Sequence, residues 1–165
     1  MPSSYSFDVV SEFDYQELVN AIDQLRREVD QRYDLKDSKT KIDIKDEELT
    51  IVSSSDMTIE AVKDVLMQKA TKRNLSLKIF DFQKLETIGG NMVMQTVKLR
   101  KGLPQEVSKK LSKLVRDNIK KVTVSIQGDS LRITGKNKDD LQSVINLIKN
   151  QEDDLEIALQ FQNYR

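Results

Sequence analysis

Residues 41–53 read KIDIKDEELTIVS, and residues 123–135, which lie 82 positions further along the 165-residue chain, read TVSIQGDSLRITG. In both stretches apolar and polar residues alternate on either side of a short polar turn. This pattern is typical of a β-hairpin with one buried and one exposed face. Pairing across the first turn is predicted to place Ile44 opposite Leu49. The second turn, Gly128-Asp129, suits a tight two-residue hairpin loop.

The same offset of 82 relates the segments that follow each hairpin. A helical period and then a strand period recur, at Ile59, Val62, Leu66, Leu75, Leu77 and Ile79 in the first copy and at Leu141, Val144, Ile148, Ile157, Leu159 and Phe161 in the second. Before each hairpin the pattern predicts a strand, 5–10 or 92–100, and then an amphipathic helix, which starts near Asp14 or Pro104. The predicted fold is therefore α+β, with two tandem ferredoxin-like βαββαβ domains. Each has a four-stranded antiparallel sheet with two helices on one face.

The repeat divides the chain into a first domain over 1–83 and a second, basic domain over 84–165. Residues 83–91, which contain Gly89-Gly90, are predicted to form the linker. Each half contains four strands, but duplicated units can exchange their end strands, and the pattern leaves that possibility open.

Composition excludes several kinds of chemistry. The chain has no Cys, His or Trp, so thiol nucleophiles, imidazole bases and Cys/His zinc sites are impossible. No enzyme motif is complete and no cofactor or metal is expected, so we predict that the protein is not an enzyme.

No apolar run approaches the roughly 20 residues that cross a bilayer, and the start lacks a signal-peptide pattern. We therefore expect a cytoplasmic protein that does not bind membranes.

Charge indicates an anionic partner. Residues 84–138 contain 13 Lys or Arg and four acidic residues, a net charge of +9, although the whole chain has 27 of each sign. One predicted surface is a helix stripe, which contains Lys109, Lys113, Arg116 and Lys120. The other is a polar sheet face, which contains Lys98, Arg100, Lys121 and Arg132. Arg132 and Lys136 are predicted to point into solvent and to hold phosphates, whereas no aromatic stacking platform is predicted on this face.

Several stretches resemble the YajQ family of bacterial nucleotide-binding proteins. They are Phe7-Asp8-Val9-Val10-Ser11-Glu12, Asn20-Ala21, Arg32-Tyr33-Asp34, Lys72-Arg73, Gln95-Thr96-Val97-Lys98-Leu99, Gln127-Gly128-Asp129, Arg132, Thr134-Gly135-Lys136, Asp139-Asp140-Leu141-Gln142, Leu159-Gln160-Phe161 and Asn163-Tyr164-Arg165. The chain departs from the family pattern at Ser4-Tyr5-Ser6, Asp37 and Met94.

The resemblance implies a non-enzymatic protein that binds nucleotides, cyclic di-GMP in some members, and RNA as a further ligand. It assigns functional weight to Arg32, Lys36, Lys98, Arg132, Lys136 and Arg165. Our first hypothesis is a nucleotide-binding protein whose nucleotide-bound form is recognised by a protein or DNA partner. The alternative is an RNA-binding module that contacts backbone phosphates, and a third is a protein-interaction scaffold.

Overall fold

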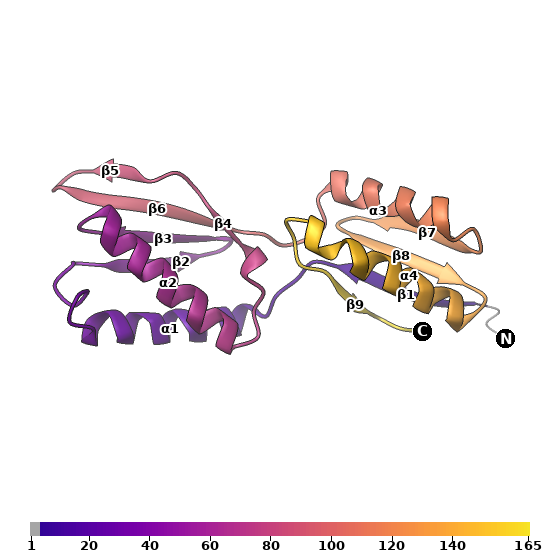
Figure 1. Cartoon of the computed structure of the whole chain (residues 1–165), viewed down its shortest axis with the longest axis horizontal. Coiled ribbons are helices and arrows are strands. Elements are labelled where there is room, and N and C mark those ends of the chain that lie inside the picture. The colour runs from indigo at the N-terminus through magenta and orange to yellow at the C-terminus, as the bar shows by residue number, and fades with distance from the viewer. Residues whose placement is uncertain (1–3) are drawn as a thin grey trace. The chain divides into compact units, whose positions relative to one another are not determined.

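The computed structural model describes residues 4–165. Within them it contains four α-helices and nine β-strands (Figure 1). In chain order the elements are β1 (Tyr5–Val10), α1 (Tyr15–Gln31), β2 (Lys41–Lys45), β3 (Glu48–Ser53), α2 (Asp56–Lys72), β4 (Phe80–Phe82), β5 (Glu86–Ile88), β6 (Met92–Leu99), α3 (Gln105–Asn118), β7 (Val122–Gln127), β8 (Ser130–Gly135), α4 (Lys138–Gln151) and β9 (Gln160–Gln162). Short 3₁₀ turns cover Leu77–Ile79 and Glu152–Asp154.

The chain forms two compact units. Phe13–Arg100 make the central unit, whereas Lys101–Arg165 and the segment up to Glu12 make the terminal unit. The central sheet has the strand order β2-β3-β6-β4 with β5 beside β6, and the terminal sheet has the order β7-β8-β1-β9. Both orders are those of a ferredoxin-like sheet, and two helices accompany each, so the predicted fold class is confirmed.

Each half of the sequence completes the sheet of the other. Strand β1 pairs with β8 and β9, and strand β6 pairs with β3 and β4. The compact units therefore do not follow the expected division into 1–83 and 84–165. The first strand of each half, β1 or β6, is therefore exchanged. The sequence left this open, because the alternation of a strand specifies its buried face but not the strand that it pairs with.

Hairpin registers agree with the sequence pattern. Ile44 lies opposite Leu49 in β2 and β3. Ile126 lies opposite Leu131 in β7 and β8. Gly128 begins the second turn with a φ of 62°, a left-handed conformation that glycine adopts without steric strain. Turn chemistry and hydrophobic alternation thus select the same register in each hairpin.

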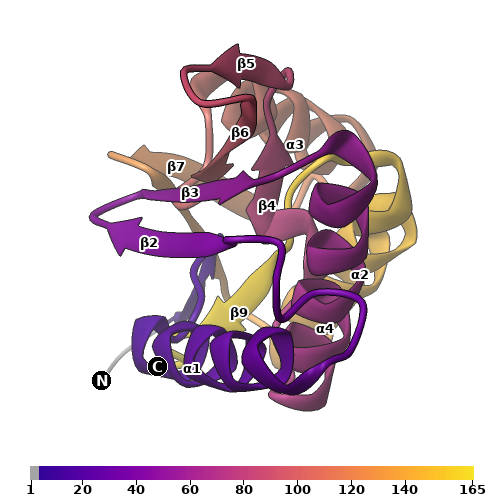
Figure 2. The same ribbon diagram turned by 90° about the vertical axis from the view of Figure 1, so that its left-hand side faces the viewer.

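In the central unit, α1 and α2 cover one face of the sheet (Figure 2). Helix α1 starts where the sequence predicts, because the Asp14 side chain accepts a hydrogen bond from the backbone N–H of Glu17. The core contains Leu18 and Leu25 of α1 and Leu49 and Ile51 of β3, all of them fully buried. Burying each of these side chains contributes roughly 1.5–3 kcal/mol to folding.

The terminal unit has its own core. Phe7 and Val9 of β1 are fully buried there against Leu131 and Ile133 of β8, under α3 and α4. Because these β1 side chains have no exposed area, β1 is an integral strand of this unit.

Three expected segments differ in the structure. The predicted linker over 83–91 contains β5, which pairs with β6 around the Gly89-Gly90 turn. The strand periods at Leu75 to Ile79 and at Ile157 to Phe161 predict longer strands than the structure contains, because β4 begins only at Phe80 and β9 covers only Gln160–Gln162. Before β4 the chain forms a 3₁₀ turn, in which Ser76 accepts a hydrogen bond from the N–H of Lys78.

No helix within residues 4–165 is long and apolar enough to span a membrane.

Candidate functional site

The eight cations predicted to bind phosphate divide equally between the units. Lys121, Arg132, Lys136 and Arg165 belong to the terminal unit, and Arg32, Lys36, Lys98 and Arg100 belong to the central unit. The expectation of one cationic sheet face is wrong, because β6, which carries Lys98, lies in a different sheet from β7 and β8.

The charge of each compact unit also differs from that of the sequence half that was expected to form it. The terminal unit has 12 basic and 11 acidic side chains, and the central unit has 15 and 16. Within the terminal unit, however, residues 101–138 carry 10 basic and three acidic side chains, whereas its remaining segments carry two and eight. Most of this positive charge lies on α3 and in the short segments that flank the hairpin of β7 and β8, because the hairpin itself contains only Arg132 and Asp129.

In the central unit, Lys98 and Arg100 lie beside carboxylates. Lys98 is opposite Glu48 on one neighbouring strand and opposite Asp81 on the other. Nη2 of Arg100 lies 3.3 Å from Oδ1 of Asp81, and Nη1 donates a hydrogen bond to the carbonyl of Lys78. Because neighbouring carboxylates compensate both cations, this part of the sheet is a poor site for an anion.

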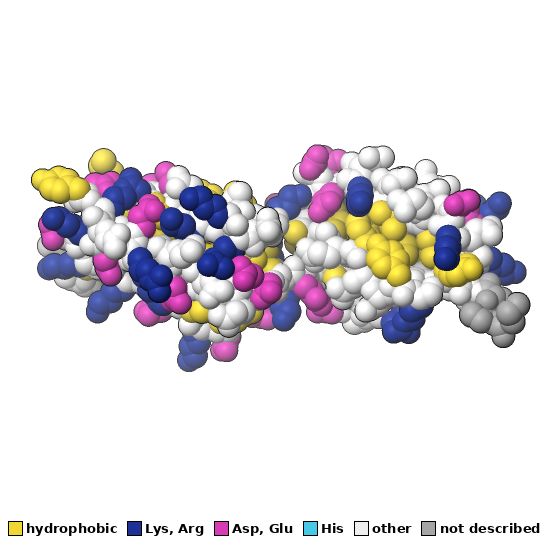
Figure 3. Space-filling view, turned by 90° about the horizontal axis from the view of Figure 1, so that it is seen from below, with side chains coloured by type: hydrophobic (Ala, Val, Ile, Leu, Met, Phe, Trp, Pro, Cys, Tyr) yellow, Lys and Arg dark blue, Asp and Glu magenta, His cyan; other side chains and the backbone are white. Residues whose placement is uncertain are grey.

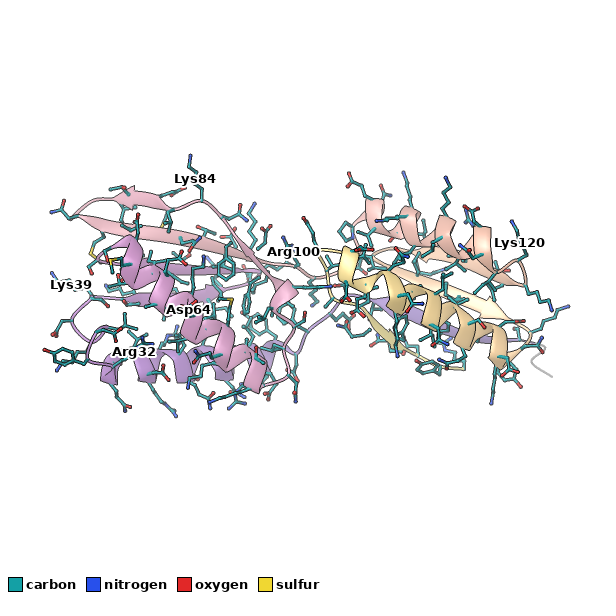
Figure 4. The ribbon with its side chains drawn as sticks, in the orientation of Figure 1. Arg32, Lys39, Asp64, Lys84, Arg100 and Lys120 are labelled. Carbon is teal, nitrogen blue, oxygen red and sulfur yellow. The ribbon has the colours of Figure 1, made fainter. Side chains whose placement is uncertain are left out.

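Arg32 and Lys36 occupy the loop after α1. Nε of Arg32 is 2.8 Å from Oδ1 of Asp34, so Arg32 is already paired. Nζ of Lys36 lies 5.4 Å from the ring centroid of Tyr33, whose exposed fraction is 88%. Figure 4 shows Arg32 and Arg100 at opposite ends of the central unit. The four predicted cations of this unit therefore do not converge on one site.

In the terminal unit, Arg132 makes an ion pair that its position in the sequence does not reveal. Its Nε donates to Oδ1 of Asp8 over 3.0 Å, and Nδ2 of Asn163 donates to Oδ2 of the same carboxylate over 2.9 Å. The hydrogen bond from Arg132 holds the pKa of the Asp8 carboxyl below its usual value. The carboxylate in turn raises the pKa of Arg132.

This contact corrects the expectation that Arg132 points freely into solvent. Its side chain is 37% exposed, and Asp8 holds one edge of the guanidinium. Nη1 and Nη2 of Arg132 have no hydrogen-bond partner in the described part of the chain, so a planar edge remains for a phosphate. Sequence reasoning missed Asp8, because its position between Phe7 and Val9 indicates only that it points to the opposite face of the strand, whereas its burial depends on the neighbouring strands.

The other three predicted cations of the terminal unit, Lys121, Lys136 and Arg165, lie where β1 and β7 begin and β8 ends. Val122 and Tyr5 both pair with Gly135, so Lys121 and Lys136 lie next to the start of β1. Arg165 joins them because its backbone N–H donates to the carbonyl of Ser6, and the N–H of Ser6 donates back.

A fourth cation, Lys138, completes this group and was not predicted. Its Nζ lies 5.1 Å from the ring centroid of Tyr5. We call Lys121, Lys136, Lys138 and Arg165 the cationic end. None of the four forms an ion pair with a carboxylate within residues 4–165. An anion can therefore approach them without displacing a carboxylate.

Arg132 and Lys136 are close enough to serve one extended ligand but not one phosphate. Lys136 follows the end of β8 and is four positions after Arg132, which corresponds to about 13 Å of extended chain. A ligand that uses both has to carry negative charge at two places, or the lysine side chain has to reach along the sheet.

Together these features define the class: an α+β protein of two ferredoxin-like units, one of which carries unpaired cations at one end of its sheet. A family model described as "Nucleotide-binding protein YajQ-like" matches residues 5–165. The chain therefore belongs to this family, as the sequence resemblance indicated.

Curated relatives cover the whole chain. A protein of Prochlorococcus marinus strain NATL1A is 87% identical over 165 residues, which are all of both chains. Proteins of Synechococcus sp. strains CC9605 and JA-3-3Ab are 68% and 55% identical, again over the full length of both chains. All three relatives are named nucleotide-binding proteins.

Proposed function

We propose that this protein binds a nucleotide through the terminal unit and does not catalyse a reaction. The observation that carries the proposal is the cationic end, in which four exposed cations have no carboxylate partner within residues 4–165. The cations on which sequence reasoning also relied in the central unit, Arg32 and Arg100, are paired with carboxylates. The names of the relatives support the same class of ligand.

Arg132 and the cationic end together favour a ligand with more than one phosphate. The free edge of the Arg132 guanidinium suits two-point binding of one phosphate, and Lys136 and Lys121 attract a second as point charges. Cyclic di-GMP has two phosphates and is our first candidate, with GTP as the matched linear ligand.

Catalysis is not part of the proposal. The chain lacks the thiol and imidazole groups that most often act as nucleophile or base near neutral pH. The buried carboxylate nearest the site, Asp8, has a lowered pKa because Arg132 donates a hydrogen bond to it. It therefore stays ionised and engaged near neutral pH, which makes it a poor proton donor.

The test is calorimetric titration of the full chain with cyclic di-GMP and with GTP. Replacing Lys121 and Lys136 together with Ala should weaken binding at least about tenfold, since two charge-assisted contacts are lost. Both side chains are exposed, so folding should be unchanged. The matched control replaces Lys36 and Lys98 of the central unit with Ala and should bind normally. Equal affinities for the two double variants would refute the site.

A second candidate function is RNA binding along α3. Its exposed face carries Lys109, Lys113 and Arg116 at helical spacing, and none of them has an ion-pair partner within residues 4–165. Such a row contacts successive backbone phosphates without reading sequence. Affinity for single-stranded RNA should then fall steeply between about 50 and 200 mM salt, because several counterions are released. Replacing Lys109 and Lys113 with Gln should reduce that salt slope, whereas nucleotide affinity should not change.

A further inference from the structure

A hollow of about 460 Å³ opens beside the cationic end of the terminal unit. The residues that matter for its chemistry are Tyr5, Lys138, Leu141, Ile145, Tyr164 and Arg165. Its volume falls in the range of small-molecule sites, roughly 300–1,000 Å³. Figure 3 shows hydrophobic side chains gathered on one face of this unit, with individual lysine or arginine side chains over and beside them.

Two of the four tyrosines of the chain line this hollow. The Tyr164 ring stacks on the buried ring of Phe7, with centroids 5.9 Å apart and planes inclined by 29°. Its side chain is nevertheless 64% exposed, so ring area remains for a second stacking partner. Tyr5 is 38% exposed. The backbone hydrogen bonds between Ser6 and Arg165 hold the two segments that carry these rings side by side.

The charged side chains that line the hollow are basic. Lys138 and Arg165 line it, and neither forms an ion pair within residues 4–165. Asp139 and Asp140 follow Lys138 in the chain but do not line the hollow. A hollow of about 350 Å³ in the central unit differs from it, because two acidic and two basic side chains line that one (Asp30, Asp43, Arg26 and Lys41) and none of its lining residues is aromatic.

We propose that the hollow of the terminal unit is the base-binding subsite of a nucleotide. The base stacks on Tyr164 and Tyr5 against the apolar floor of Leu141 and Ile145, and its phosphate contacts Lys138 and Arg165. The inference rests on the proposed nucleotide-binding function and adds the part that recognises a base, which lysines alone do not provide. Stacking uses the π-face that every base has, so the subsite accepts guanine and adenine alike.

The test is calorimetric titration of the full chain with GMP, AMP and ribose 5-phosphate. Tyr164→Leu keeps an apolar cover over Phe7 but removes the aromatic ring. It should weaken GMP and AMP binding about 30-fold, which is the middle of the range for loss of one stacking contact. Tyr164→Phe should bind like the wild type, and so should Tyr33→Leu, the control in the central unit. Ribose 5-phosphate, which has no base, should bind weakly and equally to all four proteins.

The possible failures are distinguishable. Equal GMP affinity for the wild type and Tyr164→Leu would overturn the base subsite and leave the proposed function standing. A wild-type protein that binds none of GMP, GTP and cyclic di-GMP would overturn both. A second measurement needs no variant: on addition of GMP, the NMR ring signals of Tyr5 and Tyr164 should shift, whereas that of Tyr33 should not. Shifts at Tyr33 alone would contradict the subsite.

Discussion

Arg132 and Asp8 are 124 residues apart in the chain, yet Nε of Arg132 lies 3.0 Å from Oδ1 of Asp8 across neighbouring strands of one sheet. This contact joins the first strand of the chain to the second sequence repeat, and it orients the arginine that we assign to phosphate binding. It therefore links the exchanged fold to the candidate site.

The first prediction concerns the stability of this contact. Both oxygens of the buried Asp8 carboxylate accept hydrogen bonds, one from Arg132 and one from Asn163. Asp8→Asn has one acceptor instead of two, so one donor loses its partner and the charge on Arg132 is no longer balanced. We expect the free energy of unfolding to fall by about 1–2 kcal/mol, measured by urea denaturation. The exposed carboxylate Asp37 is the control, and Asp37→Asn should change stability by less than about 0.5 kcal/mol.

The second prediction concerns pH. Because Arg132 lowers the pKa of Asp8 in the folded state, the unfolded chain binds a proton at this residue more readily than the folded chain does. The contribution of Asp8 is therefore complete above its ordinary pKa of 3.8 and is lost as the pH falls through the lower folded value. Unfolding free energies between pH 7 and about pH 2.5 should show a steeper acid loss for the wild type than for Asp8→Asn. Parallel curves for the two proteins would contradict the assignment.

The third prediction concerns which parts of the chain fold alone. A fragment of residues 84–165 lacks β1, which pairs with both β8 and β9, so we expect it to be unfolded. Residues 13–100 contain every strand of the central sheet and should fold cooperatively. Circular dichroism and thermal unfolding measure both outcomes.

A joined fragment provides the control for this comparison. The N–H of Gly102 donates to the carbonyl of Ser11 over 2.6 Å, so Glu12 and Lys101 are near enough for a short linker to connect them. Residues 1–12 linked to 101–165 should then fold as the complete terminal unit. Cooperative unfolding of residues 84–165 without β1 would refute the exchanged arrangement.

The fourth prediction separates the two cores. Phe7 is fully buried in the terminal unit and Ile51 is fully buried in the central unit. Phe7→Ala should cost about 3–5 kcal/mol and Ile51→Ala about 2–5 kcal/mol, since each leaves a cavity. Amide hydrogen exchange should show lost protection mainly in β7, β8 and α4 for Phe7→Ala, and in β2, β3 and α2 for Ile51→Ala. If Phe7→Ala instead released the amides of β2 and β3, assignment of β1 to the terminal unit would be wrong.

Local features were predictable from sequence. Alternation around Asp46-Glu47 and Gly128-Asp129 identified both hairpins and their registers, because the residues that pair there are close in the chain. The Asp14 cap and the helix that starts after Pro104 were identified for the same reason. The apolar positions that recur at an offset of 82 also indicated two ferredoxin-like units.

The grouping of charges was not predictable in the same way. Lys98 and Arg132 occupy strands with similar polar faces, and the sequence pattern predicted that both lie on one surface. In the structure Lys98 lies between Glu48 and Asp81, whereas Arg132 lies against Asp8. The neighbours of a strand decide which carboxylates a cation meets, and those neighbours come from distant segments.

The sequence by itself determined the helices, the two hairpins and the buried face of each, since all of these follow from short-range periodicity. Only the tertiary structure decided that β1 and β6 exchange places, that Asp8 holds Arg132, and that Tyr5 and Tyr164 meet at one hollow. The physical reason is that a period of two specifies which side of a strand is buried, but the backbone hydrogen bonds that join strands are the same for every partner. Partner choice depends on how whole surfaces pack, and it brought together the residues of the proposed site.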